Sequence, residues 1–318
     1  KTQILTLRIA NILIKTDAEP ENILALTFTE TAAANMRRRL TELMGTAGYY
    51  INIHTFHGFC NKLIHEYPEN FPRIIGSAAV SPADQIDIIR KIIDATKLKH
   101  LKPFGSKYYY APEILKSIRQ LKNEALDPQQ FKKITRSPKN VELALIYQKY
   151  QSELTRKKHY DFEDMILETV TALKHNKVFL LDLQEKYQYI LVDEHQDTNG
   201  AQNKALELLA GYDAKPNLFV VGDEKQAIFR FQGASLENFL YFKSKFPQVK
   251  LISLKQNYRS LQHILDAGHS LIEKNKAVLA LTKLKSQTDS QGQIKVAAFG
   301  QPEVEYIFIS EKIKELLN

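Results

Sequence analysis

Two adjacent carboxylates, Asp193 and Glu194, directly follow a short apolar run at residues 190–192. A buried strand that delivers acidic residues to its carboxyl end is typical of parallel sheets that carry nucleotide chemistry. One such acid can hold Mg²⁺, and its neighbour can take a proton from a water molecule that attacks a phosphate. A strand that runs out into an acidic loop has the same pattern, so this segment alone leaves both interpretations open.

Further short motifs lie on both sides of the acidic pair. They are Leu-Ala-Leu-Thr-Phe-Thr at 24–29 with an Ala- and Arg-rich stretch to Arg39, His-Thr-Phe-His-Gly-Phe-Cys at 54–60, Leu-Phe-Val-Val-Gly-Asp at 218–223, then Gln226, Phe229, Phe231 and Gly233-Ala234, and Gln-Asn-Tyr-Arg-Ser at 256–260. In this order and at these separations, from Lys1 to about Ser260, the set resembles the UvrD/Rep/PcrA family of superfamily-one DNA helicases. Several motifs in series are far more specific than any one of them.

Length and composition limit the number of domains and the cellular compartment. The chain has 318 residues, 44% of them hydrophobic, which is enough for one large domain or a few ordinary ones. Its single cysteine, Cys60, rules out an internal disulfide and fits a reducing cytosol. No run approaches the ~18 apolar residues of a membrane span, and the N-terminal segment lacks the layout of a signal peptide. We therefore expect a cytoplasmic protein that has no membrane partner.

Positive charge is concentrated in one window. The net charge of the chain is +8, whereas residues 85–160 alone hold 17 Lys and Arg against 7 Asp and Glu, a net charge of +10. A polyanionic partner explains such a window, and so does an ordinary solvated helical surface. The helicase-like motifs favour the polyanion, which would be DNA.

The expected elements alternate between strands and helices, which predicts a parallel α/β sheet. Strands are expected at 23–28, 51–53, 188–193, 217–221, 250–254 and 293–298, and helices at 3–15, 30–44, 56–66, 200–210, 261–275 and 303–317, with a polar connector at 276–290. Residues 82–174 instead show long helical periodicity interrupted at prolines. The resemblance implies a RecA-like P-loop NTPase domain formed by residues 1–80 and 175–254, a basic helical insertion at 81–174, and part of a second RecA-like domain at 255–318.

The chain begins with Lys1-Thr2, the residue types that end a phosphate-cradling Gly-x-x-x-x-Gly-Lys-Thr loop. It stops after one strand–helix unit of the expected second domain. We therefore expect a fragment that lacks the phosphate-loop glycines and the later motifs of the family.

The resemblance implies an ATP site with Mg²⁺ as its cofactor. The implied roles are Lys1 on the β- and γ-phosphates, Thr2 and Asp193 on Mg²⁺, Glu194 as catalytic base, Gln226 as γ-phosphate sensor, Tyr258 stacked on adenine, and Arg259 as an arginine finger from the second domain. Outside that context Gln226 would be a turn glutamine, Tyr258 a core tyrosine and Arg259 half of a surface ion pair.

The resemblance also implies contacts with DNA. The positions that match stacking residues are Phe28, Phe229 and Phe231, and Thr29 is a further DNA-binding position. Thr55 and His57 match positions near the phosphate backbone. Three positions depart from the family: Gln3 replaces an adenine-stacking arginine, Phe229 replaces a tyrosine, and Gln232 replaces an arginine. His195 is assigned no chemistry, and Asp161 is expected to cap a helix.

These residues indicate an ATP-driven motor that moves 3′ to 5′ on single-stranded DNA and at junctions with duplex, as in DNA repair helicases; the polarity follows from the resemblance alone. The fragment itself is expected to be weakly active or inactive. Two alternatives stay open: the motor part of a helicase–nuclease subunit of the AddA/RecB type, and a nonmotor DNA-binding protein with a decayed ATP site.

Overall fold

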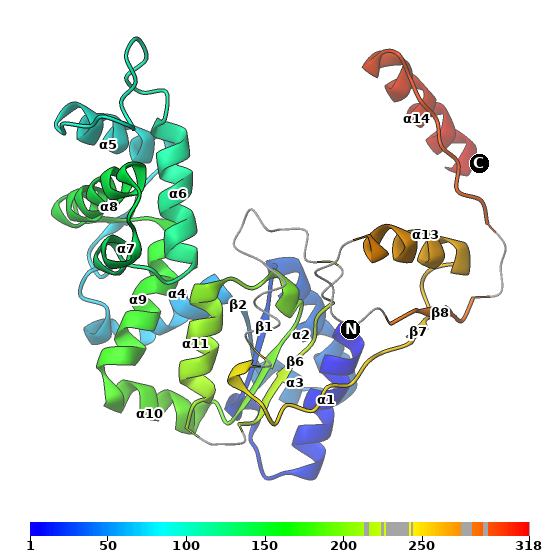
Figure 1. Ribbon diagram of the computed structural model, residues 1–318. Helices are drawn as coiled ribbons and strands as arrows, with labels where there is room; N and C mark the ends of the chain where they lie inside the picture. The colour runs from blue at the N-terminus through cyan, green and yellow to red at the C-terminus, as the bar shows by residue number, and fades with distance from the viewer. Residues whose placement is uncertain are drawn as a thin grey trace. The chain divides into compact units, whose positions relative to one another are not determined.

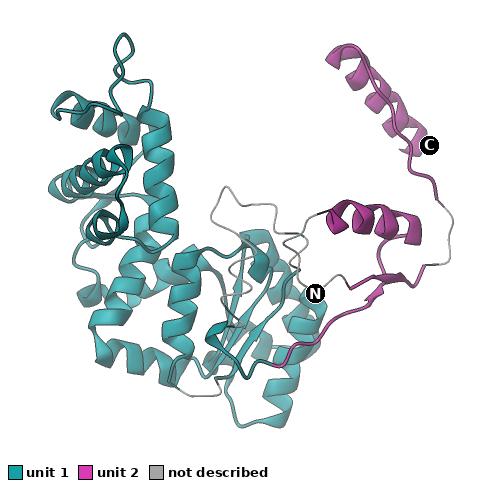
Figure 2. Ribbon diagram, viewed as in Figure 1, with its two compact units in different colours: residues 1–249 teal, residues 250–318 magenta. Residues whose placement is uncertain are grey.

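The computed structural model describes residues 1–212, 216–223, 226, 242, 244–274, 282–288 and 292–317. The chain divides into two compact units, Lys1–Val249 and Lys250–Asn318 (Figure 2). The predicted DNA contacts Phe229 and Phe231, together with Gln232 and Gly233-Ala234, lie outside the described residues.

A four-stranded parallel sheet forms the centre of the first unit (Figure 1). Its strands are β1 (Ile23–Thr27), β2 (Asn52–Thr55), β5 (Tyr189–Val192) and β6 (Leu218–Val220), in the order β2-β1-β5-β6. Leu24 of β1 is paired with Asn52 on one side and with Ile190 on the other. All strands run the same way, so their carboxyl ends meet at one edge, and the predicted parallel α/β fold is confirmed.

Helices cover both faces of this sheet. The bounds are α1 (Thr2–Lys15), η1 (Pro20–Asn22), α2 (Glu30–Met44) and α3 (Ala47–Tyr50), then α4 (Phe56–Glu66), η2 (Pro68–Asn70), α9 (Phe162–His175), α10 (Lys177–Lys186), η3 (His195–Asp197) and α11 (Gly200–Ala210). Alternate residues of β1 face opposite cores: Ile23 and Ala25 join the apolar cluster with α1 and α2, whereas Leu24 and Leu26 join the one with α4, α9, α10 and α11. This two-residue alternation is what a strand buried on both faces requires.

A helical region with its own apolar core lies between β2 and β5 in the sequence. It comprises β3 (Ala78–Ala79), α5 (Pro82–Asp94), α6 (Ala111–Asn123), α7 (Pro128–Ile134), α8 (Pro138–Arg156) and β4 (His159–Tyr160). Pro112, Pro128 and Pro138 stand in the first turns of α6, α7 and α8, where the missing N–H has no intrahelical acceptor, and Pro103 lies in the loop before α6. The expected helices are present, but α9, which falls within the expected insertion, packs in the core of the sheet.

The second unit contains β7 (Gln256–Asn257), α13 (Gln262–Glu273), β8 (Lys285–Ser286) and α14 (Pro302–Leu317). The predicted strands at 250–254 and 293–298 are wrong, because these described residues form no strand. The strands that pair are β7 and β8, and β8 lies within the expected polar connector. An apolar run becomes a strand only where a neighbouring strand pairs with it, and β7 and β8 are the paired strands in this part of the described chain. Among the described helices, none is long and apolar enough to cross a bilayer.

Candidate nucleotide site and adjoining groove

The acidic pair lies immediately after β5, at the carboxyl edge of the sheet. Asp193 is 3% exposed, and its backbone N–H donates to the carbonyl of Leu26 at 2.9 Å, so pairing with β1 continues past the strand. Glu194 has left-handed backbone angles, φ 49° and ψ 43°, and η3 begins at the next residue. A non-glycine residue held in this region costs about 1–2 kcal/mol, and such strain is concentrated at functional positions.

The first two residues of the chain reach this acidic pair. The ammonium of Lys1 donates to Oε2 of Glu194, and its Nζ lies 3.5 Å from Oε1 of Gln226. The hydroxyl of Thr2 donates to Oδ2 of Asp193 at 2.7 Å. Helix α1, which begins at Thr2, is held in place because its buried face packs against the sheet. The predicted ATP residues of the first unit are thus brought together, and the site opens at the amino end of a long helix, where anions are favoured.

Gln196 ties the acidic turn to the end of the neighbouring strand. Its side-chain amide donates to Oε2 of Glu194 at 2.6 Å, and its Oε1 accepts from the backbone N–H of Asp223 at 2.9 Å. A Cβ at Gly222 would lie 3.0 Å from that oxygen, so a larger residue would crowd the bridge. Asp223 in turn accepts from the amide of Gln226 at 2.8 Å. Sequence reasoning passed over Gln196, although a polar residue between two carboxylates in an otherwise buried turn is a signal for such a role.

These contacts set the ionisation of the acids. Burial opposes ionisation of Glu194, but the hydrogen bonds from Gln196 and Lys1 and the charge of Lys1 outweigh it, so the pKa of Glu194 is lowered. The pKa of Asp197 is raised, chiefly by burial and also by the negative charge of Glu194. Glu194 is therefore an ionised carboxylate at neutral pH, as a proton acceptor must be.

The oxygen ligands at this edge fit Mg²⁺. The hydroxyl of Thr2 and the carboxylate of Asp193 are hard oxygen donors that already lie 2.7 Å apart. Magnesium in nucleotide sites is held by few protein oxygens and keeps waters and phosphate oxygens as its other ligands. Among the residues that the structure describes, no group of three or more His, Cys, Asp or Glu is arranged to hold a metal by itself.

His195 has a structural environment. Its ring is completely buried, it shares a hydrogen bond of 3.1 Å with Oδ1 of Asn203, and it packs edge-on against Phe242. Burial lowers its pKa to about 4, so the ring is neutral. The His195 ring is thus a buried, hydrogen-bonded part of the acidic turn.

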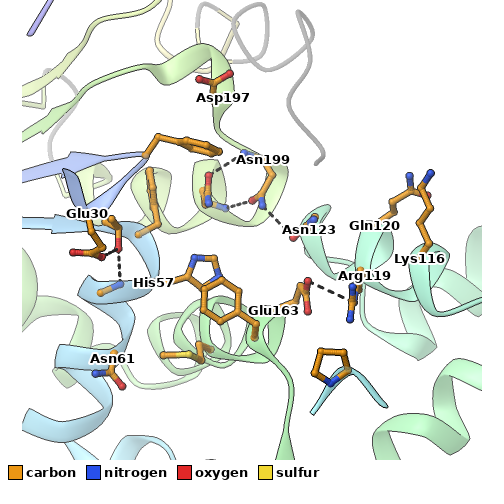
Figure 3. Close-up of a pocket in the computed structure, with 18 of the residues that line it drawn as sticks. Glu30, His57, Asn61, Lys116, Arg119, Gln120, Asn123, Glu163, Asp197 and Asn199 are labelled. Atoms are coloured by element: carbon orange, nitrogen blue, oxygen red, sulfur yellow. Dashed lines mark hydrogen bonds and ion pairs between the residues drawn. The ribbon is translucent and has the colours of Figure 1, made fainter. Parts of the chain in front are cut away.

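A groove of about 1160 Å³ adjoins the sheet edge (Figure 3). On the sheet side its lining includes the predicted DNA contacts Phe28, Thr55 and His57, and on the other side it includes Lys116, Arg119, Gln120 and Asn123 of α6. Thr29 is one residue beyond the lining and caps α2 by accepting from the backbone N–H of Ala32. Three of the predicted contacts therefore face one cavity.

Thr55 and His57 are already engaged within the protein. The Thr55 hydroxyl donates to Glu30 at 2.7 Å and accepts from the N–H of Gly58, which caps α4. The ring of His57 stacks on Phe162 at 3.6 Å, and burial lowers its pKa to about 4. Nε2 of His57 is buried without a hydrogen-bond partner among the described residues, and its contact with DNA stays a prediction.

The α6 side of the groove was missed in the sequence analysis. Lys116, Arg119, Gln120 and Asn123 recur at intervals of three and four residues, which places them on one helical face. Lys116 is exposed, and Arg119 donates to Gln85 at 2.7 Å and lies 3.9 Å from Glu163. The spacing of these polar residues within the basic window was the signal that could have identified them.

Two family models together match almost the whole chain. The UvrD/REP helicase N-terminal domain matches residues 1–247, and the UvrD-like helicase C-terminal domain matches residues 252–318. The chain belongs to the UvrD/Rep helicase family.

Curated relatives agree with this assignment. A protein from Staphylococcus epidermidis described as ATP-dependent DNA helicase PcrA is 35% identical over 275 residues, 86% of this chain and 37% of the relative. A protein from Staphylococcus aureus with the same description is 34% identical over the same shares. The chain thus spans about 37% of the length of these UvrD/Rep relatives.

Two predicted ATP residues of this UvrD/Rep chain lie in the second unit. Tyr258 is 75% exposed and its hydroxyl donates to Gln256 at 2.6 Å, and the backbone N–H of Arg259 donates to Asn257 at 2.9 Å. Each unit is described by itself, so contact of Tyr258 and Arg259 with a nucleotide stays a prediction.

A buried charge cluster joins α6 to α9. Lys122, which is 1% exposed, donates to Asp161 at 2.5 Å and to Asp164 at 2.8 Å. Arg73 donates to Asp164 at 2.7 Å and to Glu168 at 2.6 Å. Asp161 also caps α9, as predicted. The cluster fixes α6, which carries the polar wall of the groove, to α9, whose first turn also lines the groove.

Proposed function

We propose that this chain is the nucleotide-binding part of a motor that hydrolyses ATP and moves 3′ to 5′ on single-stranded DNA, including at junctions with duplex. The observation that carries the proposal is the meeting of Lys1 and Thr2 with Asp193 and Glu194, almost two hundred residues apart in the sequence. A cation, a hydroxyl, two acids and a glutamine at one sheet edge form the set that phosphoryl transfer needs. Family membership and the helicase relatives support the same reaction.

Each residue has a distinct task in this proposal. Lys1 leaves its contact with Glu194 to neutralise the phosphates of bound ATP, which frees the ionised Glu194 to accept a proton from the attacking water. Thr2 and Asp193 hold Mg²⁺, which when bound neutralises phosphate charge. Gln196 keeps the Glu194 carboxylate in place during the exchange. Gln226, whose Oε1 lies 3.5 Å from Nζ of Lys1, contacts the terminal phosphate when ATP is bound and so senses its presence. Its hydrogen bond to Asp223 links this contact to the residues that follow β6.

The nucleic acid occupies the groove between the sheet edge and α6. Phe28 lines the groove and is the residue proposed to contact a base, and Lys116 is an exposed cation without an ion-pair partner in the described chain. Stacking and phosphate contacts recognise a strand regardless of its sequence, which is what a translocating protein requires. We further propose that Tyr258 and Arg259 complete the ATP site from the second domain, and that the 318-residue chain alone hydrolyses ATP slowly.

The test is a comparison of two charge-neutralising substitutions in the full-length protein that carries this chain. Glu194→Gln keeps the shape of the side chain but removes the base, so ATP binding is retained while DNA-stimulated hydrolysis falls by at least ~100-fold. The matched control is Glu185→Gln, at an exposed position of α10 that has no resolved contact with the site.

The rate is measured by phosphate release, with and without a single-stranded oligonucleotide. Hydrolysis by Glu194→Gln at the rate of the Glu185→Gln control would remove Glu194 from the mechanism. A wild-type protein that binds DNA but neither binds nor hydrolyses ATP would instead support a nonmotor DNA-binding protein.

A further inference from the structure

The loop between α5 and α6 projects from the helical region, away from the sheet (Figure 1). Residues 97–107, which we call the lysine loop, contain Lys97, Lys99, His100, Lys102 and Lys107 and no acidic residue. Phe104 lies at the centre of this segment and is fully exposed, with a relative exposure of 108%. None of these residues lines the groove described above. The loop is thus a second place where positive charge and an aromatic ring occur together.

The base of the lysine loop is held in a fixed shape. The carboxylate of Glu142 on α8 accepts from the backbone N–H groups of Lys99 at 2.6 Å, His100 at 3.0 Å and Leu101 at 2.9 Å. Leu101 is buried in the helical core, 2% exposed. A loop fixed in this way loses little further conformational entropy when a ligand binds.

The other end of the loop is fixed as well. Asp94 accepts from the ammonium of Lys107 at 3.0 Å and from the hydroxyl of Tyr108 at 2.6 Å. The ammonium of Lys102 donates to the carbonyl of Ile93 at 3.1 Å. These contacts occupy the cations near the base and leave the side chains of Lys97 and Lys99 exposed.

The charge of the exposed part is not neutralised locally. Lys97 and Lys99 have no ion-pair partner among the described residues. The two carboxylates that contact the loop have other partners: Asp94 binds Lys107 and Tyr108, and Glu142 accepts from three backbone N–H groups. For Glu142, burial opposes ionisation, but these three donors outweigh it and its pKa is lowered. The loop therefore presents a net positive surface beside an exposed aromatic ring.

We propose that the lysine loop binds single-stranded nucleic acid outside the groove, with Lys97 and Lys99 on phosphates and Phe104 against a base. Phe104 can stack only on a base whose face is open, and in a duplex those faces are covered by the neighbouring pairs. Ammonium groups and a phenyl ring read no base edges, so the contact is independent of sequence. The inference rests on the proposed function and extends it, because it adds a second contact for the strand held in the groove.

The test compares oligonucleotides of two lengths in the full-length protein. One has about 8 nucleotides, enough for the groove alone, and the other has about 25, enough to reach the loop as well. The variants are Phe104→Ala and the double substitution Lys97→Gln with Lys99→Gln. The matched control is Lys132→Gln with Lys133→Gln, two exposed lysines on α7. All these side chains are exposed, and far-UV circular dichroism verifies that each variant is folded.

Fluorescence anisotropy gives the dissociation constants. Phe104→Ala is expected to weaken binding of the long oligonucleotide about 5- to 150-fold and to leave the short one unchanged. The double lysine variant is expected to reduce the slope of log K against log salt by about 1.4, which corresponds to two phosphates on a single strand. The control variant should match the wild-type protein for both lengths.

Three results would overturn the inference. In the first, the variants bind the long oligonucleotide as tightly as the control does. In the second, the substitutions weaken binding of both oligonucleotides equally. In the third, they weaken binding of a blunt duplex as much as binding of the long single strand. Binding of the short oligonucleotide and ATP hydrolysis by the wild-type protein test the proposed function separately. Each can succeed while the inference about the lysine loop fails.

Discussion

Removal of Lys122 should destabilise the protein strongly, and more at neutral than at acidic pH. The Lys122 ammonium is completely buried between Asp161 and Asp164, and the ring of Tyr150 lies 5.3 Å from it. In Lys122→Met the apolar side chain keeps most of the volume, but Asp161 loses the cation 2.5 Å away. Asp164 keeps its contact with Arg73 at 2.7 Å. The loss of charge balance therefore falls mainly on Asp161.

The magnitude follows from the ionisation of Asp161. Burial already raises the pKa of this carboxyl, and Lys122 is the group that opposes the rise, so its removal raises the pKa further. Breaking a buried ion pair costs about 3–5 kcal/mol. Protonation of Asp161 limits the loss, because binding a proton at pH 7 to a group with an unfolded pKa of about 3.9 costs at most ~4 kcal/mol. We expect a loss of about 3–4 kcal/mol at pH 7.

The pH dependence has a definite sign. A carboxyl whose pKa is raised in the folded state contributes most stability below its unfolded pKa, and that contribution is lost as the pH rises. The same limit is only about 1.5 kcal/mol at pH 5. The difference between variant and wild type should therefore shrink as the pH falls from 7 to 5, by at most about 1.4 kcal/mol per pH unit. Taking the difference removes contributions from groups that titrate alike in both proteins.

The assay is urea unfolding followed by far-UV circular dichroism at pH 7 and pH 5. The matched control is Lys139→Met, which removes a lysine on α8 whose ion pair with Glu113 is 3.2 Å long and about half exposed. Such a surface pair contributes ~0–1 kcal/mol, so this control should stay close to wild type at both pH values. A Lys122→Met protein as stable as the control at pH 7, or one whose deficit grows toward pH 5, would refute the reasoning.

Two other substitutions test the site and the fold. Gln196→Ala removes a hydrogen bond that lowers the pKa of Glu194, so the acid limb of the pH–rate profile for ATP hydrolysis should move to higher pH. An unchanged acid limb would show that Gln196 does not position Glu194. Gly48→Ala places a Cβ 2.6 Å from the backbone of α2 and should lower the free energy of unfolding by about 1–3 kcal/mol in urea titrations. The control Gly268→Ala meets open space within α13 and should stabilise by up to ~1 kcal/mol, so equal effects of the two glycine changes would contradict this explanation.

The strands and helices of the first unit could be predicted because local patterns determine them. The residues of β1 from Ile23 to Leu26 and all those of β5 are hydrophobic, and strands that are buried on both faces require this composition. The strands predicted at 250–254 and 293–298 are absent because local patterns alone do not determine a strand. Whether an extended apolar run forms a strand depends on a partner elsewhere in the chain, and the run itself does not identify one.

The site was predictable only in part. The Asp193-Glu194 pair stood out because two adjacent acids after an apolar run have a chemical meaning. Gln196 and Lys122 were missed because their importance comes from partners that are distant in sequence or turned inward by the fold: Gln196 bridges to Asp223, and Lys122 pairs with residues about forty positions away. A buried lysine has the same local sequence signature as an exposed one in a basic helix, so burial alone distinguishes them.

The central claim is that the phosphates of ATP displace Glu194 from Lys1. The most direct measurement is the affinity of the full-length protein for a nonhydrolysable ATP analogue, compared between Lys1→Met and Glu194→Gln. Loss of the cation should weaken binding about 10- to 150-fold, as expected for a hydrogen bond to a charged group, whereas loss of the competing carboxylate should leave binding equal to wild type or tighter. Equal affinities for both variants and wild type would show that the nucleotide does not bind between these two side chains.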